Sequence, residues 1–146
     1  MAQEQKELLL KDICARLPYG VKVESVFINP DTKEHKPCGI EVFDATSILM
    51  IRDGLGEFKP YLFPLSSMTE EQAFELFNLF GLECPSTEED YIKINEVTGI
   101  TFFLLKGFDV ETHLDKLIDW LNKNHFDYRG LIEKSLALDA TNLNIY

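Results

Sequence analysis

The amino-acid sequence predicts a single α+β domain over residues 1–146. We expect an N-terminal helix, a small curled antiparallel sheet of about four strands, then a helix, a β-hairpin and C-terminal helices. Helical and strand-like patterns are segregated along the chain rather than strictly alternating, which favours this class over a doubly wound fold. The length of 146 residues is typical of one domain, and the chain has no internal repeat or linker-like run.

The composition is that of an ordinary globular protein. Hydrophobic residues make up 45% of the chain and charged residues 27%. No apolar stretch approaches the roughly 20 residues that a membrane-spanning helix needs, and the N-terminus lacks the pattern of a secretion signal. Cys14, Cys38 and Cys84 are widely spaced, which fits reduced thiols. We therefore expect a cytoplasmic protein with no membrane contact.

The charge is concentrated in the C-terminal half. The net charge is −11; residues 1–65 contribute −2 and residues 66–146 contribute −9. Between Lys59 and Lys93 there is no basic residue. A negative field repels phosphate backbones, so we expect no direct binding of nucleic acid.

The first elements follow from apolar spacing. Leucine, isoleucine and cysteine at helical intervals predict a helix from about Glu4 to Arg16. Alternating valines and Ile28 predict a strand, and the change of phase near Ser25 indicates a bulge or bend. The segment Asn29 to Pro37 is rich in turn residues and predicts a loop.

Three short apolar runs then predict strands joined by hairpin turns: Gly39 to Phe43, Ser47 to Arg52 and Glu57 to Phe63. The turns would be Asp44-Ala45-Thr46 and Asp53-Gly54-Leu55-Gly56. Because proline cannot donate to a strand ladder, Pro60 and Pro64 make the third run an edge strand or an exit from the sheet.

In the second half, Thr69-x-x-Gln72 is a capping box that predicts a helix up to Gly81. Residues 92–104 predict a second hairpin. Asp109 is placed as the N-cap of a helix that ends near Asn122. Residues 126–138 should pack on the body as a loop and short helical turn, and we expect residues 139–146 to fray.

The sequence carries no catalytic, cofactor or metal-binding signature. His35-x-x-Cys38, with Asp31 and Glu34 nearby, lacks the second ligand pair of a zinc site and is interpreted as a solvated turn. Asp109 and His113 have the i, i+4 spacing at which a carboxylate could prepare a histidine as a general base. No nucleophile accompanies them, so Asp109 is interpreted as a helix cap.

The acidic groups are interpreted in the same way. Glu70 and Glu71 would lie in the first turn of a helix, where acids favour the helix dipole, whereas Glu88, Glu89 and Asp90 lack the ligand pattern of an EF-hand. A solvated acidic face is therefore favoured over a metal site.

Aromatic residues give the candidate partner-binding segment. Phe58, Tyr61 and Phe63 alternate on the proline-broken run, where core positions are favoured and exposure to a partner is the alternative. Together with the acidic residues they form the candidate partner-binding set, which is Phe58, Tyr61, Phe63, Glu70, Glu71, Glu88, Glu89 and Asp90.

Three blocks of the chain resemble a known family: LLLKDICARLPYGVKVE (Leu8 to Glu24), KPYLFPLSSMTEEQ (Lys59 to Gln72) and IDWLNKNHFDYRGLIEKSLAL (Ile118 to Leu138). The chain resembles an uncharacterised family of short proteins of Bacteroides-type gut bacteria, associated with prophages and mobile elements. This resemblance implies a cytoplasmic accessory protein and supplies no catalytic residues. Residues 27–56 lie outside it, so a role specific to this chain is expected there.

These observations leave three hypotheses. The first is a non-enzymatic accessory protein that binds an unidentified protein partner, in an oligomeric state that the sequence leaves open. The second is an acidic DNA mimic that inhibits a nucleic-acid enzyme of the host, suggested by the −9 half of the chain. The third is a small hydrolase or transferase that uses His113 or His125.

Overall fold

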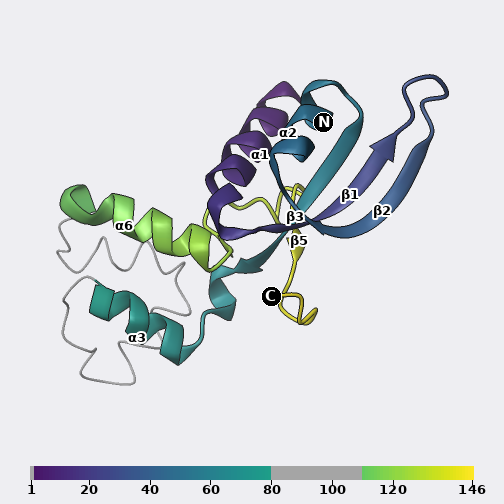
Figure 1. Ribbon diagram of the computed structural model, residues 1–146. Helices are drawn as coiled ribbons and strands as arrows, with labels where there is room; N and C mark the ends of the chain where they lie inside the picture. Colours follow the sequence, from purple (N-terminus) through teal and green to yellow (C-terminus); the bar gives the residue numbers. More distant parts are fainter. Residues whose placement is uncertain (1, 80–109) are drawn as a thin grey trace. The chain divides into compact units, whose positions relative to one another are not determined.

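The computed structural model describes residues 2–79 and 110–146, and it has the α+β architecture that the sequence predicts (Figure 1). Helices accompany a mixed sheet of about five strands that does not close into a barrel. The predicted hairpin at residues 92–104, the cap Asp109 and the helix end at Gly81 lie outside the described residues. None of the helices within the described ranges is long and apolar enough to cross a membrane.

Contacts within the chain divide it into two compact units. Unit 1 comprises Met1–Leu62 and Arg129–Tyr146, and unit 2 comprises Phe63–Tyr128. Each unit has a hydrophobic core of its own. The single domain over residues 1–146 stays a prediction.

Unit 1 begins with helix α1 (Gln3–Ala15), which confirms the predicted N-terminal helix. A short 3-10 helix (Leu17–Tyr19) follows and leads into strand β1 (Lys22–Ile28). Ile13 of α1 packs with Val21 and Val23 in the core of the unit. Apolar spacing therefore predicted both elements correctly, because both bury one face against the same core.

Strand β2 (His35–Val42) returns antiparallel to β1, and this hairpin extends away from α1 of the same unit (Figure 1). The predicted loop at residues 29–37 is thus wrong in its last three residues, which already belong to the strand. Asn29 closes the turn: its side-chain oxygen accepts hydrogen bonds from the backbone N–H groups of Asp31, at 2.9 Å, and Thr32, at 3.1 Å.

The bulge predicted near Ser25 is confirmed, but its extra residue lies on β2. Ser25 pairs with Gly39 and Val26 pairs with Pro37, so Cys38 is left without an opposite residue. Gly39 has a φ of 87°, a conformation that glycine adopts without strain and that is typical of a bulge. The Ser25 hydroxyl donates to the carbonyl of Gly39 at 3.2 Å and fastens this position.

The predicted strand over Ser47 to Arg52 is wrong, because this segment is helix α2 (Ala45–Arg52). Asp44 caps the helix: its carboxylate accepts a hydrogen bond from the backbone N–H of Ser47 at 2.9 Å, which lowers the pKa of Asp44. Gly54, with a φ of 69°, follows the end of the helix, so the predicted hairpin turns on either side of α2 are helix ends instead. The spacing of apolar residues in this short run fits both a strand and a helix, and the cap at Asp44 favours the helix.

Strand β3 (Gly56–Pro64) is a central strand, so the predicted edge position of this run is wrong. In unit 1 it pairs antiparallel with β1 and parallel with β5 (Leu138–Asp139). The sheet is therefore mixed and not wholly antiparallel as predicted. Within the described residues β5 pairs only with Tyr61 and Leu62, so Pro60 meets no ladder partner on that side of β3.

Unit 2 holds the last two residues of β3, a 3-10 helix (Leu65–Ser67), helix α3 (Glu70–Leu79), helix α6 (Val110–Lys123) and strand β4 (Phe126–Asp127). The predicted capping box is present: Gln72 N–H donates to the Thr69 hydroxyl at 3.2 Å, and Thr69 N–H donates to the Gln72 side chain at 2.9 Å. Trp120 stacks on Phe126, with ring centroids 5.7 Å apart, in the core of the unit.

The C-terminal segment returns to unit 1 and is anchored, so the expected fraying is wrong. Leu131 and Ala140 are buried. The hydroxyl of Tyr146 accepts a hydrogen bond from the backbone N–H of Lys22 at 3.0 Å and donates to the carbonyl of Tyr61 at 2.7 Å. Lys22 and Tyr61 are the next pair in the β1–β3 register after Val23 and Pro60. The phenol hydroxyl therefore bridges two backbone groups that would otherwise bond directly in the ladder.

This bridge predicts a measurable role for the Tyr146 hydroxyl. Tyr146→Phe should lower the free energy of unfolding by about 1 kcal/mol, since it removes the partner of both backbone groups. Burial raises the pKa of Tyr146 from 10.0 to about 12. A raised pKa means that the folded protein holds the proton more tightly, so the contribution is complete below pH 10 and is lost as the pH rises through about 12. Urea unfolding of both proteins at pH 7 and at increasing alkaline pH measures this; a difference that does not shrink above pH 10 would contradict the bridge.

Candidate functional site

The three aromatic residues of the candidate partner-binding segment lie within β3 and are not exposed. Phe58 is 4% exposed and Tyr61 is 7% exposed, while Phe63 is half-buried against the core of unit 2. The Tyr61 hydroxyl donates to Glu24 at 2.7 Å, and burial together with this bond raises its pKa to about 12. The alternative that these side chains are exposed to a partner assumed that β3 is an edge strand, which it is not.

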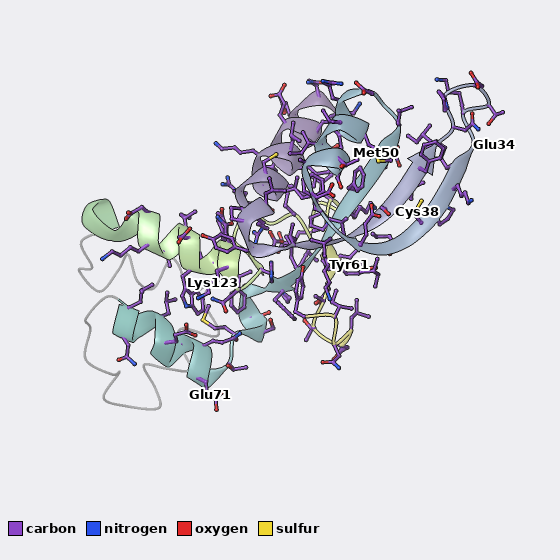
Figure 2. The ribbon with its side chains drawn as sticks, viewed as in Figure 1. Glu34, Cys38, Met50, Tyr61, Glu71 and Lys123 are labelled. Atoms are coloured by element: carbon purple, nitrogen blue, oxygen red, sulfur yellow. The ribbon has the colours of Figure 1, made fainter. Side chains whose placement is uncertain are left out.

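Few of the predicted acidic residues fall within the described residues. The side chain of Glu71 is exposed at the start of α3 (Figure 2), as is that of Glu75 one turn later. The side chain of Glu70, and Glu88, Glu89 and Asp90, lie outside the described residues. Asp115 and Asp119 on α6 are exposed as well. The DNA-mimic hypothesis stays a prediction.

The histidine and cysteine side chains that the structure describes form no cluster with metal-binding or catalytic geometry. His35 and Cys38 both lie on β2 and are exposed, and the nearest acid to His35 is Glu57, at 3.9 Å from Nδ1. Over residues 2–79 and 110–146, no group of three or more His, Cys, Asp or Glu residues could hold a metal ion. His125 is a packed residue in unit 2, whose carbonyl accepts a hydrogen bond from Phe63 N–H at 2.9 Å. The side chain of His113 lies outside the described residues.

The outer edge of β2 is an unpaired strand edge in the described part of the chain. The strand order places β2 at the end of the sheet, and no described strand pairs with its other side. Phe43 N–H donates to Val21 and Glu34 accepts from Asn29 N–H, each at 2.9 Å, so both of these residues turn their backbone groups toward β1. Because backbone groups alternate along a strand, the flanking residues Val42 and His35 point theirs outward. The edge is an open template for another strand.

Apolar side chains accompany this open edge. Ile40 is 51% exposed and Val42 is 53% exposed, although both are in a regular strand. Their cross-strand partners are Glu24 and Lys22, so they lie on the sheet face opposite Val23, which is buried in the core. We call this the outer face. Figure 2 shows Cys38 along the same strand and Glu34 at the tip of the hairpin.

Charges of opposite sign flank the bulge of β2. Lys36 and Glu41 are both exposed, and both lie on the face that carries Val23 and Phe27, since these are their cross-strand partners. Neither side chain has an ion pair or hydrogen bond within the described residues. The edge therefore offers one basic and one acidic group of its own, in addition to its unpaired backbone.

The sequence contains a signal for this edge that the prediction assigned elsewhere. Pro37 is a proline within a strand, which is typical of an edge, and Ile40 and Val42 alternate with polar residues. The prediction placed Pro37 in a loop and took Pro60 as the edge marker. Only the pairing of β3 with strands on both of its sides shows that β3, and not β2, is the central one of the two proline-containing strands.

No protein-family model, curated protein or solved structure matched this chain in three comparisons. The fold and the site thus define a class by themselves: an α+β protein with an open mixed sheet and an exposed edge strand.

Proposed function

We propose that this chain is a protein-binding module whose β2 edge takes up an extended strand of a partner. The observation that carries the proposal is the combination of an unpaired strand edge with two half-exposed apolar side chains, Ile40 and Val42. In such recognition, backbone hydrogen bonds give affinity and alternate side chains give specificity. This function needs no catalytic group.

The exposure of β2 supports the proposal because natural proteins usually protect an edge strand. Pro37, Lys36 and the bulge at Cys38 blunt the first half of β2 in the way that prevents indiscriminate aggregation. The second half, from Gly39 to Val42, carries no such protection on its outward groups. A half-protected edge suits a selective partner better than general adhesion.

The position of β2 in the chain also supports a role specific to this protein. β2 lies inside residues 27–56, the segment outside the resemblance to the Bacteroides-type family. An accessory role in a phage or mobile-element setting, which that resemblance implies, is part of the proposal. A partner-binding strand in the segment outside the resemblance would give this chain a partner of its own.

The proposal predicts that binding depends on the outer face of β2. The double variant Ile40→Asp/Val42→Asp should retain its fold, because both side chains are more than half exposed, and should lose the proteins that the wild-type chain captures from a lysate of a Bacteroides-type bacterium. The readout is quantitative mass spectrometry of the captured proteins, with circular dichroism to check the fold.

Leu49→Asp is the matched control. Leu49 is 49% exposed in the same unit but lies on α2, away from the strand edge, so this variant should capture the same proteins as the wild type. Equal capture by all three chains would contradict binding through β2, and specific capture by none of them would contradict a partner other than the chain itself.

A further inference from the structure

The outer edge of β2 is complementary to itself. We propose that the strand which β2 takes up is β2 of a second copy of this chain, running antiparallel across a two-fold axis at the bulge. Three pairs define the register: His35 with Val42, Lys36 with Glu41 and Pro37 with Ile40, each across the two copies. This inference rests on the proposed function and names the partner of the same edge. It would join the two sheets into one.

The bulge is what makes the two backbones match. In a regular strand only every second residue points its N–H and C=O outward. Pro37 and Ile40 are three positions apart, so in a regular strand their backbone groups would point to opposite sides. Because the bulge adds Cys38 as an extra residue, the backbone groups of both point outward. The residues before the bulge whose backbone groups point outward therefore pair with such residues after the bulge in the other copy. Pro37, which has no N–H, supplies its carbonyl to Ile40 N–H of the second copy.

The charges match in the same register. Lys36 stands opposite Glu41 of the second copy, and Glu41 opposite Lys36, so that two cross-strand ion pairs form. Both residues lie on the same sheet face, and their backbone groups turn toward β1, so this pair is of the closely spaced, non-hydrogen-bonded kind. Opposite charges at such positions stabilise strand pairing.

The apolar side chains match on the other face. Ile40 and Pro37 of the two copies stand opposite each other, with Val42 beside His35 at both ends. All four residues lie on the outer face, because their cross-strand partners on β1 alternate with the buried Val23 and Ser25. Pairing would cover Ile40 and Val42, the side chains that are 51% and 53% exposed in the single chain.

Registers that pair one half of β2 with itself are disfavoured by charge. Placing Ile40 opposite Val42 of the second copy puts Glu41 against Glu41. Placing His35 opposite Pro37 puts Lys36 against Lys36. Like charges directly opposite each other destabilise a strand pair, so the register across the bulge is selected.

Charge reversal tests this register directly on the full chain. Lys36→Glu and Glu41→Lys should each raise the dissociation constant of the dimer on the order of tenfold or more, since each change replaces two attractive pairs by two repulsive pairs. The double variant Lys36→Glu/Glu41→Lys should recover dimerisation, and an equimolar mixture of the two single variants should form a heterodimer. A single strand pair buries less than a standard interface, so sedimentation velocity is measured from micromolar to millimolar concentration.

The outcomes separate the two proposals. A wild-type chain that stays monomeric throughout, single variants that dimerise like the wild type, or a double variant that stays monomeric would each overturn the self-pairing. Loss of self-pairing with capture of another protein still dependent on Ile40 and Val42 would leave the proposed function standing. Circular dichroism establishes that each variant is folded, which is expected because Lys36 and Glu41 are exposed.

A second measurement uses the cysteine at the two-fold axis. Cys38 is exposed, and the proposed register places the Cys38 residues of the two copies next to each other across the axis. A short bismaleimide should cross-link the wild-type dimer and should give much less covalent dimer with Cys38→Ser. Cross-linking of the wild type that is no stronger than that of Cys38→Ser would contradict the position of the axis.

Discussion

Replacing Asp12 by alanine is expected to lower the free energy of unfolding by about 3–5 kcal/mol, because it leaves a buried guanidinium without its carboxylate. Asp12 on α1 and Arg16, the C-cap of that helix, are both 0% exposed. Asp12 Oδ2 accepts a hydrogen bond from Arg16 Nε at 2.7 Å and Oδ1 accepts one from Arg16 Nη2 at 3.1 Å, while Arg129 Nε lies 3.2 Å from the same Oδ1. Urea unfolding at pH 7 measures the loss.

The matched control is the exposed pair of the same residue types, Arg52 and Asp53, which are joined at 2.8 Å. Asp53→Ala should leave stability unchanged within error, because surface ion pairs contribute little. Asp12→Leu/Arg16→Met should recover most of the loss, since apolar residues of similar volume need no charge partner. If Asp12→Ala is as mild as Asp53→Ala, the ion pair is not buried as described.

Leu62→Ala should lower the free energy of unfolding by about 2–5 kcal/mol, the range for a leucine removed from a close-packed core. Leu62 is 0% exposed on β3, where it packs in the core of unit 1 with Ile13, Val21 and Leu131. These partners come from α1, the residue before β1 and the C-terminal segment, so one cavity weakens contacts among distant parts of the chain. Thermal and urea unfolding both report the effect.

Leu49→Ala serves as the control for Leu62→Ala because it makes the same chemical change at a site that is 49% exposed. Its effect should lie within about 0.5 kcal/mol of zero, as is usual for surface substitutions. Equal effects at Leu49 and Leu62 would contradict the assignment of Leu62 to the core.

Local pattern predicted the longest elements correctly. α1 and α6 follow from apolar residues at helical spacing, and the box formed by Thr69 and Gln72 correctly marked the start of α3. The segment after Asp44 was misassigned because eight residues with β-branched and aliphatic side chains fit a strand and a helix equally well. The hydrogen bond from Ser47 N–H to Asp44 decides for the helix, and Asp44-x-x-Ser47 could have been recognised as its cap.

The position of the edge strand was predicted wrongly. An edge strand or an exit from the sheet was expected at Glu57 to Phe63, whereas the described edge strand is His35 to Val42. Both strands contain a proline, so this signal alone does not show which of them lies at the edge of the sheet. What differs is the number of strands that pair with each, and this depends on β4 and β5, strands of two residues each that no local pattern reveals.

The sequence by itself determined the α+β class, the main helices, the phase change near Ser25 and the uneven charge, because each depends on residues close together in the chain. The tertiary structure alone decided that β3 is central, that β2 has an open edge, and that Tyr146 bridges Lys22 and Tyr61. These features join residues up to 124 positions apart, so the free energy that selects them comes from pairing and burial across the fold.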